Sequence, residues 1–204
     1  MRDRQPQENR QNSWRECAIA WRAAMFDPVS YIHPSRFAAF DACKAPRQRR
    51  IINDFLIRSQ GLTVHWPHEH IGIVERLWLK HWQRLPQIAY LLGCQHHRAG
   101  LCQRGALLRL PEWAAKFALL PLIEPATSVP GKAPSHRALL VDGARRLIAL
   151  ASSLPEPLRQ RVPLLFPPCE GQALLFARST DVRLFVIAFE YAKTHPGVPP
   201  DDGG

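Results

Sequence analysis

Long apolar runs are missing from this sequence of 204 residues. A helix that crosses a bilayer needs about 20 consecutive apolar residues, and the longest runs here, residues 117–123 and 184–189, have only the size of core segments. Residues 1–12 are charged and amide-rich and lack the apolar segment of a secretory signal. The sequence therefore predicts a soluble cytoplasmic protein.

Regularly spaced cysteines are missing as well. The five cysteines are odd in number and do not form the repeated spacing of a disulfide framework. Free thiols of this kind fit a reducing compartment. With 46% hydrophobic residues, the chain can bury a core as one domain without cross-links.

Acidic residues are few. Seventeen Asp and Glu stand against 27 Lys and Arg, which gives a formal charge of +10. Such a charge indicates either a surface for nucleic acid or anionic membrane, or a contact face for acidic protein partners. The arginines are scattered, and the densest cluster is Arg47-Gln48-Arg49-Arg50. Most aromatic residues fall at helical spacing among apolar ones, which favours burial over base stacking.

Amphipathic segments separated by prolines indicate an all-α fold, a single irregular multi-helix domain. Ser13 and Glu16 have the spacing of a capping box, so we expect the first helix to begin at Ser13 and residues 1–12 to form a disordered tail. The helical domain is expected to span 13–193, with a proline-rich loop at 121–134 and a disordered tail at 194–204. Further helices are expected at 35–44, 46–60, 67–82, 85–94, 111–120, 135–154 and 181–193, although residues 182–186 also suit a strand.

Two of these helices carry particular expectations. Pro46 fits the first turn of its helix and Gly61 fits the C′ position, and the buried face is expected to contain Ile51, Ile52, Phe55 and Leu56. The segment 85–94 is apolar on almost all sides, which predicts a position at the centre of the core.

Candidate chemistry is sparse. Two clusters hold possible metal ligands, His65, His68 and His70 in one and Cys94, His96, His97 and Cys102 in the other. Neither has the paired ligand spacing of tetrahedral zinc. Residues 130–135 superficially resemble a phosphate loop but lack its first glycine, and Pro134 removes an N–H that the loop would use. No nucleophile motif is present, so the sequence predicts no enzyme, no cofactor and no metal.

A polar and aromatic loop, residues 26–34, lies between two prolines. Asp27, Ser30, Tyr31 and His33 belong to it. A loop stiffened by proline loses little entropy on docking and suits a contact surface, but it can equally be a rigid connector that is packed by its own aromatic residues. The residues alone leave both readings open.

The stretch Phe26-Asp27-Pro28-Val29-Ser30-Tyr31-Ile32-His33-Pro34 resembles the Phe-x-Pro-x-x-Tyr-x-His-Pro signature of the SctK family of type III secretion proteins. Residues 85–94, with Leu110-Pro111 and residues 119–122, resemble the versions of plant-associated bacteria, including rhizobial NolU. The resemblance covers about residues 20–125.

The resemblance implies a non-enzymatic adaptor of the secretion sorting platform. Such an adaptor would link the SctD-like inner-membrane ring protein to the SctQ-like pod protein, and through it indirectly to the SctL–ATPase assembly, peripherally at the inner membrane. One expected contact patch is Asp27, Tyr31 and His33, and a second, basic patch is Arg47, Arg49 and Arg50.

Two other classes compete with this reading. A small basic nucleic-acid-binding regulator would need a recognition helix with Arg, Asn or Gln on one face, and no segment has that arrangement. A secretion chaperone is typically acidic, unlike this chain. We therefore expect protein partners and no nucleic acid.

Overall fold

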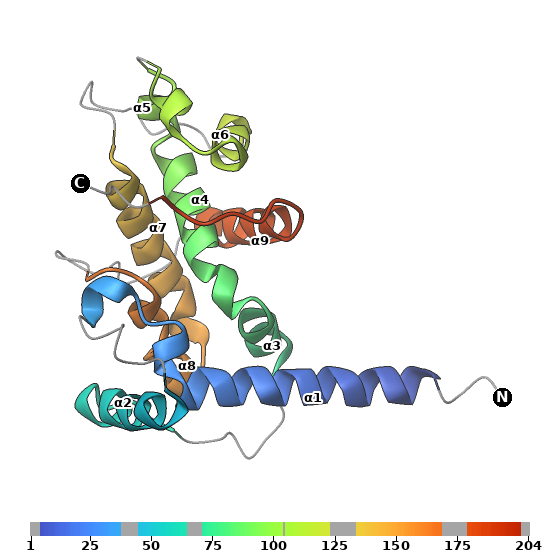
Figure 1. The fold of residues 1–204 in the computed structure, drawn as a ribbon. Helices are drawn as coiled ribbons and strands as arrows, with labels where there is room; N and C mark the ends of the chain where they lie inside the picture. Colours follow the sequence, from blue (N-terminus) through green and yellow to red (C-terminus); the bar gives the residue numbers. More distant parts are fainter. Residues whose placement is uncertain are drawn as a thin grey trace. The chain divides into compact units, whose positions relative to one another are not determined.

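The computed structural model describes residues 5–37, 45–64, 71–103, 105–122, 134–168 and 179–200, which are helices and connecting turns without a strand (Figure 1). This confirms the all-α class. Contacts divide the chain into two compact units. Unit 1 contains residues 1–83 and 154–165, and unit 2 contains residues 84–153 and 166–204. The boundaries of a domain at 13–193 stay a prediction.

Unit 1 is built around its first helix. Its elements are α1 (Gln5–Phe26), the 3-10 turns η1 (Pro28–Ser30) and η2 (Pro34–Arg36), α2 (Pro46–Ser59), α3 (Ile73–Lys80), α8 (Glu156–Arg159) and η7 (Val162–Leu165). α1 contacts α2, α3 and α8. The core of the unit is rich in large side chains, namely Trp21, Met25, Tyr31, Trp78, Trp82 and Leu158.

The start of α1 corrects the sequence prediction. The helix begins at Gln5, so residues 5–12 are helical rather than a disordered tail, and Ser13 lies inside the helix rather than at its cap. The physical reason is that Gln, Glu and Arg are good helix formers, and Pro6 falls in the first turn, where its missing N–H costs little.

The prediction of a helix at 35–44 is wrong at its start. Ser35 belongs to the short turn η2, which is capped by His33, and Phe37 is extended. Residues 38–44 lie outside the described residues, as do residues 65–70 with the helix start expected at Pro67.

The two ends of α2 lie where the sequence predicts them. Pro46 is in its first turn, and Gly61 follows its C-terminus with φ +58°. The Gly61 N–H donates to the carbonyl of Arg58 (3.1 Å) and the Leu62 N–H to that of Ile57 (2.9 Å). These are the bonds of a Schellman motif, which needs the left-handed backbone that glycine adopts most easily.

Unit 2 is centred on α4 (Leu85–His96), as the sequence predicts. Its other elements are α5 (Arg98–Leu101), η5 (Ala106–Arg109), α6 (Glu112–Leu119), α7 (His136–Leu150), η6 (Ala151–Ser153) and α9 (Ser179–Thr194), and the turn η4 (Trp82–Arg84) leads into α4. α4 packs against α6, α7 and α9, and it is buried on all sides.

Glycines allow the closest helix contact in unit 2. A methyl group at Gly143 of α7 would overlap the carbonyl oxygen of Ala89, and one at Gly93 of α4 would overlap that of Leu139. The two backbones therefore touch without intervening side chains. α7 begins at Ser135, whose Oγ accepts the Ala138 N–H (3.1 Å), as expected for an N-cap.

The C-terminal segment is more ordered than predicted. α9 is a helix, not a strand, and the chain after it lies on unit 2. The Gln87 side chain donates to the His195 carbonyl (2.5 Å), and Gly197 lies directly against the Trp113 ring. Residues 195–197 are thus a packed extension rather than a disordered tail, because glycine lets the backbone rest on the indole. Residues 201–204 and 123–133, the latter within the predicted proline-rich loop, lie outside the described residues.

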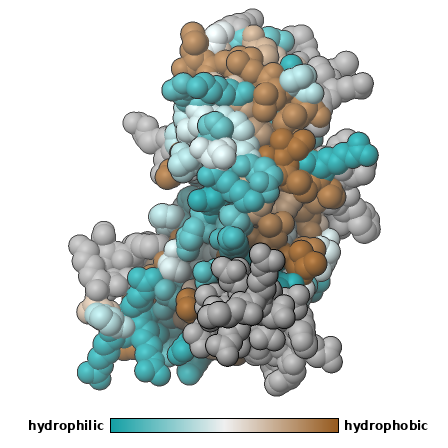
Figure 2. All heavy atoms as spheres, turned by 90° about the vertical axis from the view of Figure 1, so that its right-hand side faces the viewer, coloured by the Kyte–Doolittle hydropathy of each residue, from teal (hydrophilic) through white to brown (hydrophobic). Residues whose placement is uncertain are grey.

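An apolar surface remains on unit 2. Leu119 and Leu120 at the end of α6, and Val182, Val186 and Ile187 on α9, are between 38% and 54% exposed. Figure 2 shows hydrophobic atoms gathered over these helices. None of the helices in the described residues is long and apolar enough to cross a membrane.

Candidate functional site

The loop and the arginine cluster that the sequence singled out form one site in unit 1. Asp27 follows the last residue of α1, and its carboxylate accepts two hydrogen bonds from Arg49, one from Nε (2.9 Å) and one from Nη2 (2.7 Å). Such a bidentate pair fixes both groups in geometry as well as charge. The two predicted patches are therefore joined by Asp27 and Arg49.

Asn53 completes this junction, and no sequence pattern had marked it as a site residue. Its amide donates to Asp27 Oδ1 (2.8 Å), and its Oδ1 accepts the N–H of Val29 (2.9 Å). Asn53 is only 6% exposed. Arg49 and Asn53 are four residues apart and so share one helix face. This spacing is the sequence signal that could have linked Asn53 to the arginine cluster.

The electrostatics of Asp27 follow from these partners. Burial alone would raise the pKa of the Asp27 carboxyl, but hydrogen bonds from Arg49 and Asn53 and the charge of Arg49 outweigh it. The pKa therefore lies below its ordinary value, and Asp27 is ionised at neutral pH. The Asp27–Arg49 pair is partly exposed, with 42% of the Arg49 side chain accessible.

Tyr31 lies inside unit 1 rather than on its surface. The ring is 7% exposed and meets Trp82 edge to face at 5.5 Å between centroids. Its hydroxyl donates to the carbonyl of Ala24 (2.9 Å), and burial raises its pKa above the ordinary value. Tyr31 therefore holds the loop from within and does not offer its ring to a partner.

His33 fixes the far end of the loop. Its Nδ1 accepts the Ser35 N–H (3.2 Å) and lies 2.8 Å from Ser35 Oγ. Its backbone N–H donates to the carbonyl of Leu164 in η7 (2.8 Å). The ring is partly exposed, so it remains open to contact.

Arg161 of unit 1 is a second residue that the sequence did not reveal. It is fully buried, and it donates to the carbonyls of Thr63 (2.8 Å), Pro157 (2.8 Å) and Met25 (3.0 Å). Burial lowers its pKa, against the influence of nearby Tyr31, but a guanidinium stays protonated at neutral pH. Arg161 thus ties α1, the segment after α2 and α8 together behind the loop.

The outer face of α2 corrects the predicted core. Ile51 is 62% exposed and Phe55 is 61% exposed, whereas Leu56 is buried and Ile52 is partly buried. The polar bonds of Arg49 and Asn53 to the Asp27 loop turn the opposite face of the helix toward solvent. Arg47, Asp54 and Arg58 share that outer face with the apolar pair at spacings of three and four residues.

Two open grooves follow α2. The first encloses about 740 Å³ and is lined by α1 and α2 residues, namely Arg22, Phe26, Asp27, Pro46, Arg49, Arg50, Asn53 and Asp54. The second encloses about 570 Å³ and is lined by Ile51, Asp54, Phe55, Arg58 and Ser59. Asp54 lines both, and we call the two grooves together the track along α2.

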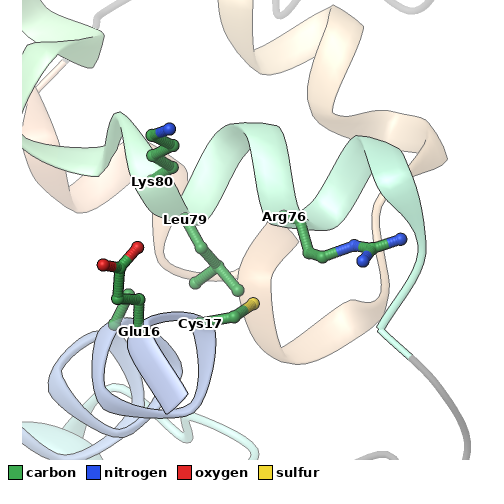
Figure 3. A pocket seen from close by; sticks show the side chains of 6 residues that line it. Glu16, Cys17, Arg76, Leu79 and Lys80 are labelled. Carbon is green, nitrogen blue, oxygen red and sulfur yellow. The ribbon is translucent and has the colours of Figure 1, made fainter. Parts of the chain in front are cut away.

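A smaller pocket of about 280 Å³ lies between α1 and α3, and Figure 3 shows the side chains that line it. Cys17 directs its sulfur toward Leu79, while Arg76 extends away from it (Figure 3). Burial raises the pKa of the Cys17 thiol, although the charge of Arg76 opposes this. A nucleophilic cysteine needs a thiolate, so this pocket does not favour cysteine chemistry.

The candidate metal and catalytic residues do not converge. Within the described residues no group of three or more His, Cys, Asp or Glu could hold a metal ion. Cys94 is fully buried in α4, Cys102 is exposed, and His97 lies 3.7 Å from Asp142. His65, His68 and His70 lie outside the described residues. Ser135 caps α7, while His136 Nδ1 meets the Tyr90 hydroxyl at 2.6 Å, so these two form no nucleophile–base pair.

Residues 21–194 match the family described as bacterial type III secretion apparatus protein (OrgA_MxiK). The chain belongs to this family, the SctK family of type III secretion, which confirms the resemblance.

The relatives agree with this assignment. The chain is 40% identical to the oxygen-regulated invasion protein OrgA of Salmonella typhimurium strains 14028s, SL1344 and LT2, over 94% of this chain and 96% of each relative. No solved structure matches the chain. The particular likeness to versions of plant-associated bacteria stays a prediction.

Proposed function

We propose that this type III secretion apparatus protein is a non-enzymatic adaptor that links the SctD-like inner-membrane ring protein to the SctQ-like pod protein. Family membership supports a place in the apparatus. The observation that carries the adaptor role is the bidentate pair of Arg49 and Asp27, which joins the two predicted contact patches in unit 1. Through the pod protein the adaptor reaches the SctL–ATPase assembly.

The proposed contact surface contains Asp27, His33, Arg47, Arg49 and Arg50. Arg47 and Arg50 are exposed, and Asp27, His33 and Arg49 are partly exposed. Tyr31, which we expected among the contacts, supports this surface from inside the unit. A basic surface of this kind suits an acidic partner face, where complementary charge speeds and directs association.

The proposed location is the cytoplasmic side of the inner membrane, peripheral to it. The net charge of +10 supports this location because basic proteins are attracted to anionic lipid head groups as well as to acidic partners. Binding there would depend on partner proteins rather than on a helix of its own in the bilayer.

The test is co-purification of the tagged chain from its host after mild membrane solubilisation, at moderate salt, with nuclease. Recovery of the SctQ-like and SctD-like proteins in equal amounts with and without nuclease is the expected result. Recovery of nucleic acid without either protein would contradict the adaptor role and favour a nucleic-acid-binding regulator.

A further inference from the structure

The outer face of α2 has apolar side chains that unit 1 leaves uncovered. We define this α2 docking face as Arg47, Arg50, Ile51, Asp54, Phe55 and Arg58. Ile51 and Phe55 are four residues apart, so their side chains are neighbours on the helix surface. Each is more than 60% exposed, while polar Asn53 of the same helix is buried. A helix that turns its apolar pair outward and its amide inward presents a surface for a partner.

Charge distinguishes this face from the apolar surface on α6 and α9. α2 carries four arginines and one aspartate, and Arg47, Arg50 and Arg58 are exposed. By contrast, α6 and α9 carry balanced charges, with Lys116 paired to Glu112 and Lys193 to Glu190. The face on α2 therefore combines uncovered apolar groups with a strong net positive charge, and the surface of α6 and α9 does not.

The shape of the track fits a helix. α2 has 14 residues, which corresponds to about 21 Å of length. The two grooves run along it, and Phe26 of α1, 49% exposed, adds a third apolar side chain to the first groove. A hydrophobic groove along a helix is a common receptor for an amphipathic helix that inserts anchors at spacings of three and four residues.

We propose that the α2 docking face binds an amphipathic helix of the SctQ-like protein, about four turns long, with apolar anchors flanked by Asp and Glu. The anchors cover Phe26, Ile51 and Phe55, and the carboxylates pair with Arg47, Arg50 and Arg58. The identity of the partner rests on the proposed function, whereas the chemistry of its helix rests on α2.

The first experiment measures the affinity of the full chain for the purified SctQ-like protein by isothermal titration calorimetry. Ile51→Ser with Phe55→Ser is expected to raise Kd by about 30-fold, as for central anchors of an interface. Arg47→Glu with Arg58→Glu is expected to raise Kd by about tenfold at low salt and by less at high salt, because salt screens exposed charges. Unfolding midpoints of the variants, compared with that of the wild type, check that each variant remains folded.

Matched controls make this measurement specific. Val182→Ser with Val186→Ser removes an exposed apolar pair of the same spacing on α9, and Arg159→Glu with Arg183→Glu reverses exposed charges elsewhere. Each control is expected to change Kd by less than about twofold. An unchanged Kd in the Ile51 and Phe55 variant, or an equal loss in the α9 control, would overturn the inference.

The second experiment identifies the bound segment. A photo-crosslinking amino acid at position 55 in the full chain is expected to capture a segment of the SctQ-like protein that is helical and rich in Asp and Glu. Capture of a basic or an extended segment would overturn the inference while leaving the adaptor role intact. If the wild-type chain binds neither the SctQ-like nor the SctD-like protein, the proposed function itself fails, and the inference with it.

Discussion

The two units of this protein are held together in different ways. In unit 2, α4 is buried on all sides, and it meets α7 so closely that glycines are required at positions 93 and 143. In unit 1, buried polar groups join the segments, with Asn53 binding the Val29 backbone and Arg161 binding the carbonyls of three segments. The contact of α4 with α7 in unit 2 depends on shape, whereas directed hydrogen bonds join α2 to the loop in unit 1.

The difference explains where a docking face can arise. Burial of apolar area is non-directional, so apolar packing places α4 of unit 2, which is buried on all sides. In unit 1 the bonds from Arg49 and Asn53 to the Asp27 loop set the orientation of α2. Leaving the buried Asn53 amide and the Val29 N–H unpaired would cost more than exposing two apolar side chains costs. Ile51 and Phe55 are consequently free to meet a partner.

The largest effect is expected where backbones touch. Gly143→Ala should lower the free energy of unfolding by about 3–4 kcal/mol, because the new methyl overlaps the Ala89 carbonyl and α4 and α7 must separate. Urea denaturation measures this. Gly100→Ala is the control, since a methyl there meets only Pro134 at 3.9 Å. Equal stability of the two variants would refute the close α4–α7 contact.

The next effect concerns the buried guanidinium of unit 1. Arg161→Met should lower the free energy of unfolding by about 2–3 kcal/mol, because the carbonyls of Met25, Thr63 and Pro157 lose their donors. Native-state hydrogen exchange should accelerate in unit 1 and change little in α4 and α7. The exposed Arg159→Met is the control. Uniform acceleration across both units would show that they do not differ as described.

A smaller effect concerns Asp27 and pH. Because the folded-state pKa lies below the ordinary 3.8, ionised Asp27 stabilises the fold above that value, and this contribution is lost as pH falls through the folded-state pKa. Asp27→Asn should therefore be less stable than wild type at pH 7, by less than about 1 kcal/mol for so exposed a pair. Denaturation midpoints of the two proteins should converge below about pH 4. A constant difference from pH 7 to pH 3 would contradict the assignment.

The smallest effect is expected on the docking face. Ile51→Ser and Phe55→Ser should each change the free energy of unfolding by no more than about 0.5 kcal/mol, because both side chains are mostly exposed. Leu56→Ala on the buried side of the same helix should cost about 2–3 kcal/mol. Thermal unfolding of the three variants tests this. Large losses for Ile51 or Phe55 would mean that these residues belong to the core.

Sequence patterns predicted the features that follow local rules better than those that long-range contacts decide. The apolar segment 85–94, the cap at Ser135 and the ends of α2 at Pro46 and Gly61 all follow local rules, and the structure confirms them. Periodicity shows which residues share a helix face but not which face turns inward. The prediction that Ile51 and Phe55 are buried was therefore wrong.

Long-range polar bonds leave even less trace in a sequence. The arginine that binds Asp27 lies 22 residues away, and Arg161 reaches the Met25 carbonyl across 136 residues. Neither spacing has a local rule. The family signature did mark the loop at 26–34, but it does not say which of its residues face solvent, and the structure places Tyr31, one of the expected contacts, inside the unit.

The most direct test of the central claim is hydrogen–deuterium exchange of the full chain, alone and with the SctQ-like protein. Binding is expected to slow exchange in α2 and the loop at 27–33 and to leave exchange in α4 and α7 unchanged. Slower exchange confined to α6 and α9, with none in α2, would contradict the claim that this protein docks its partner through the polar unit.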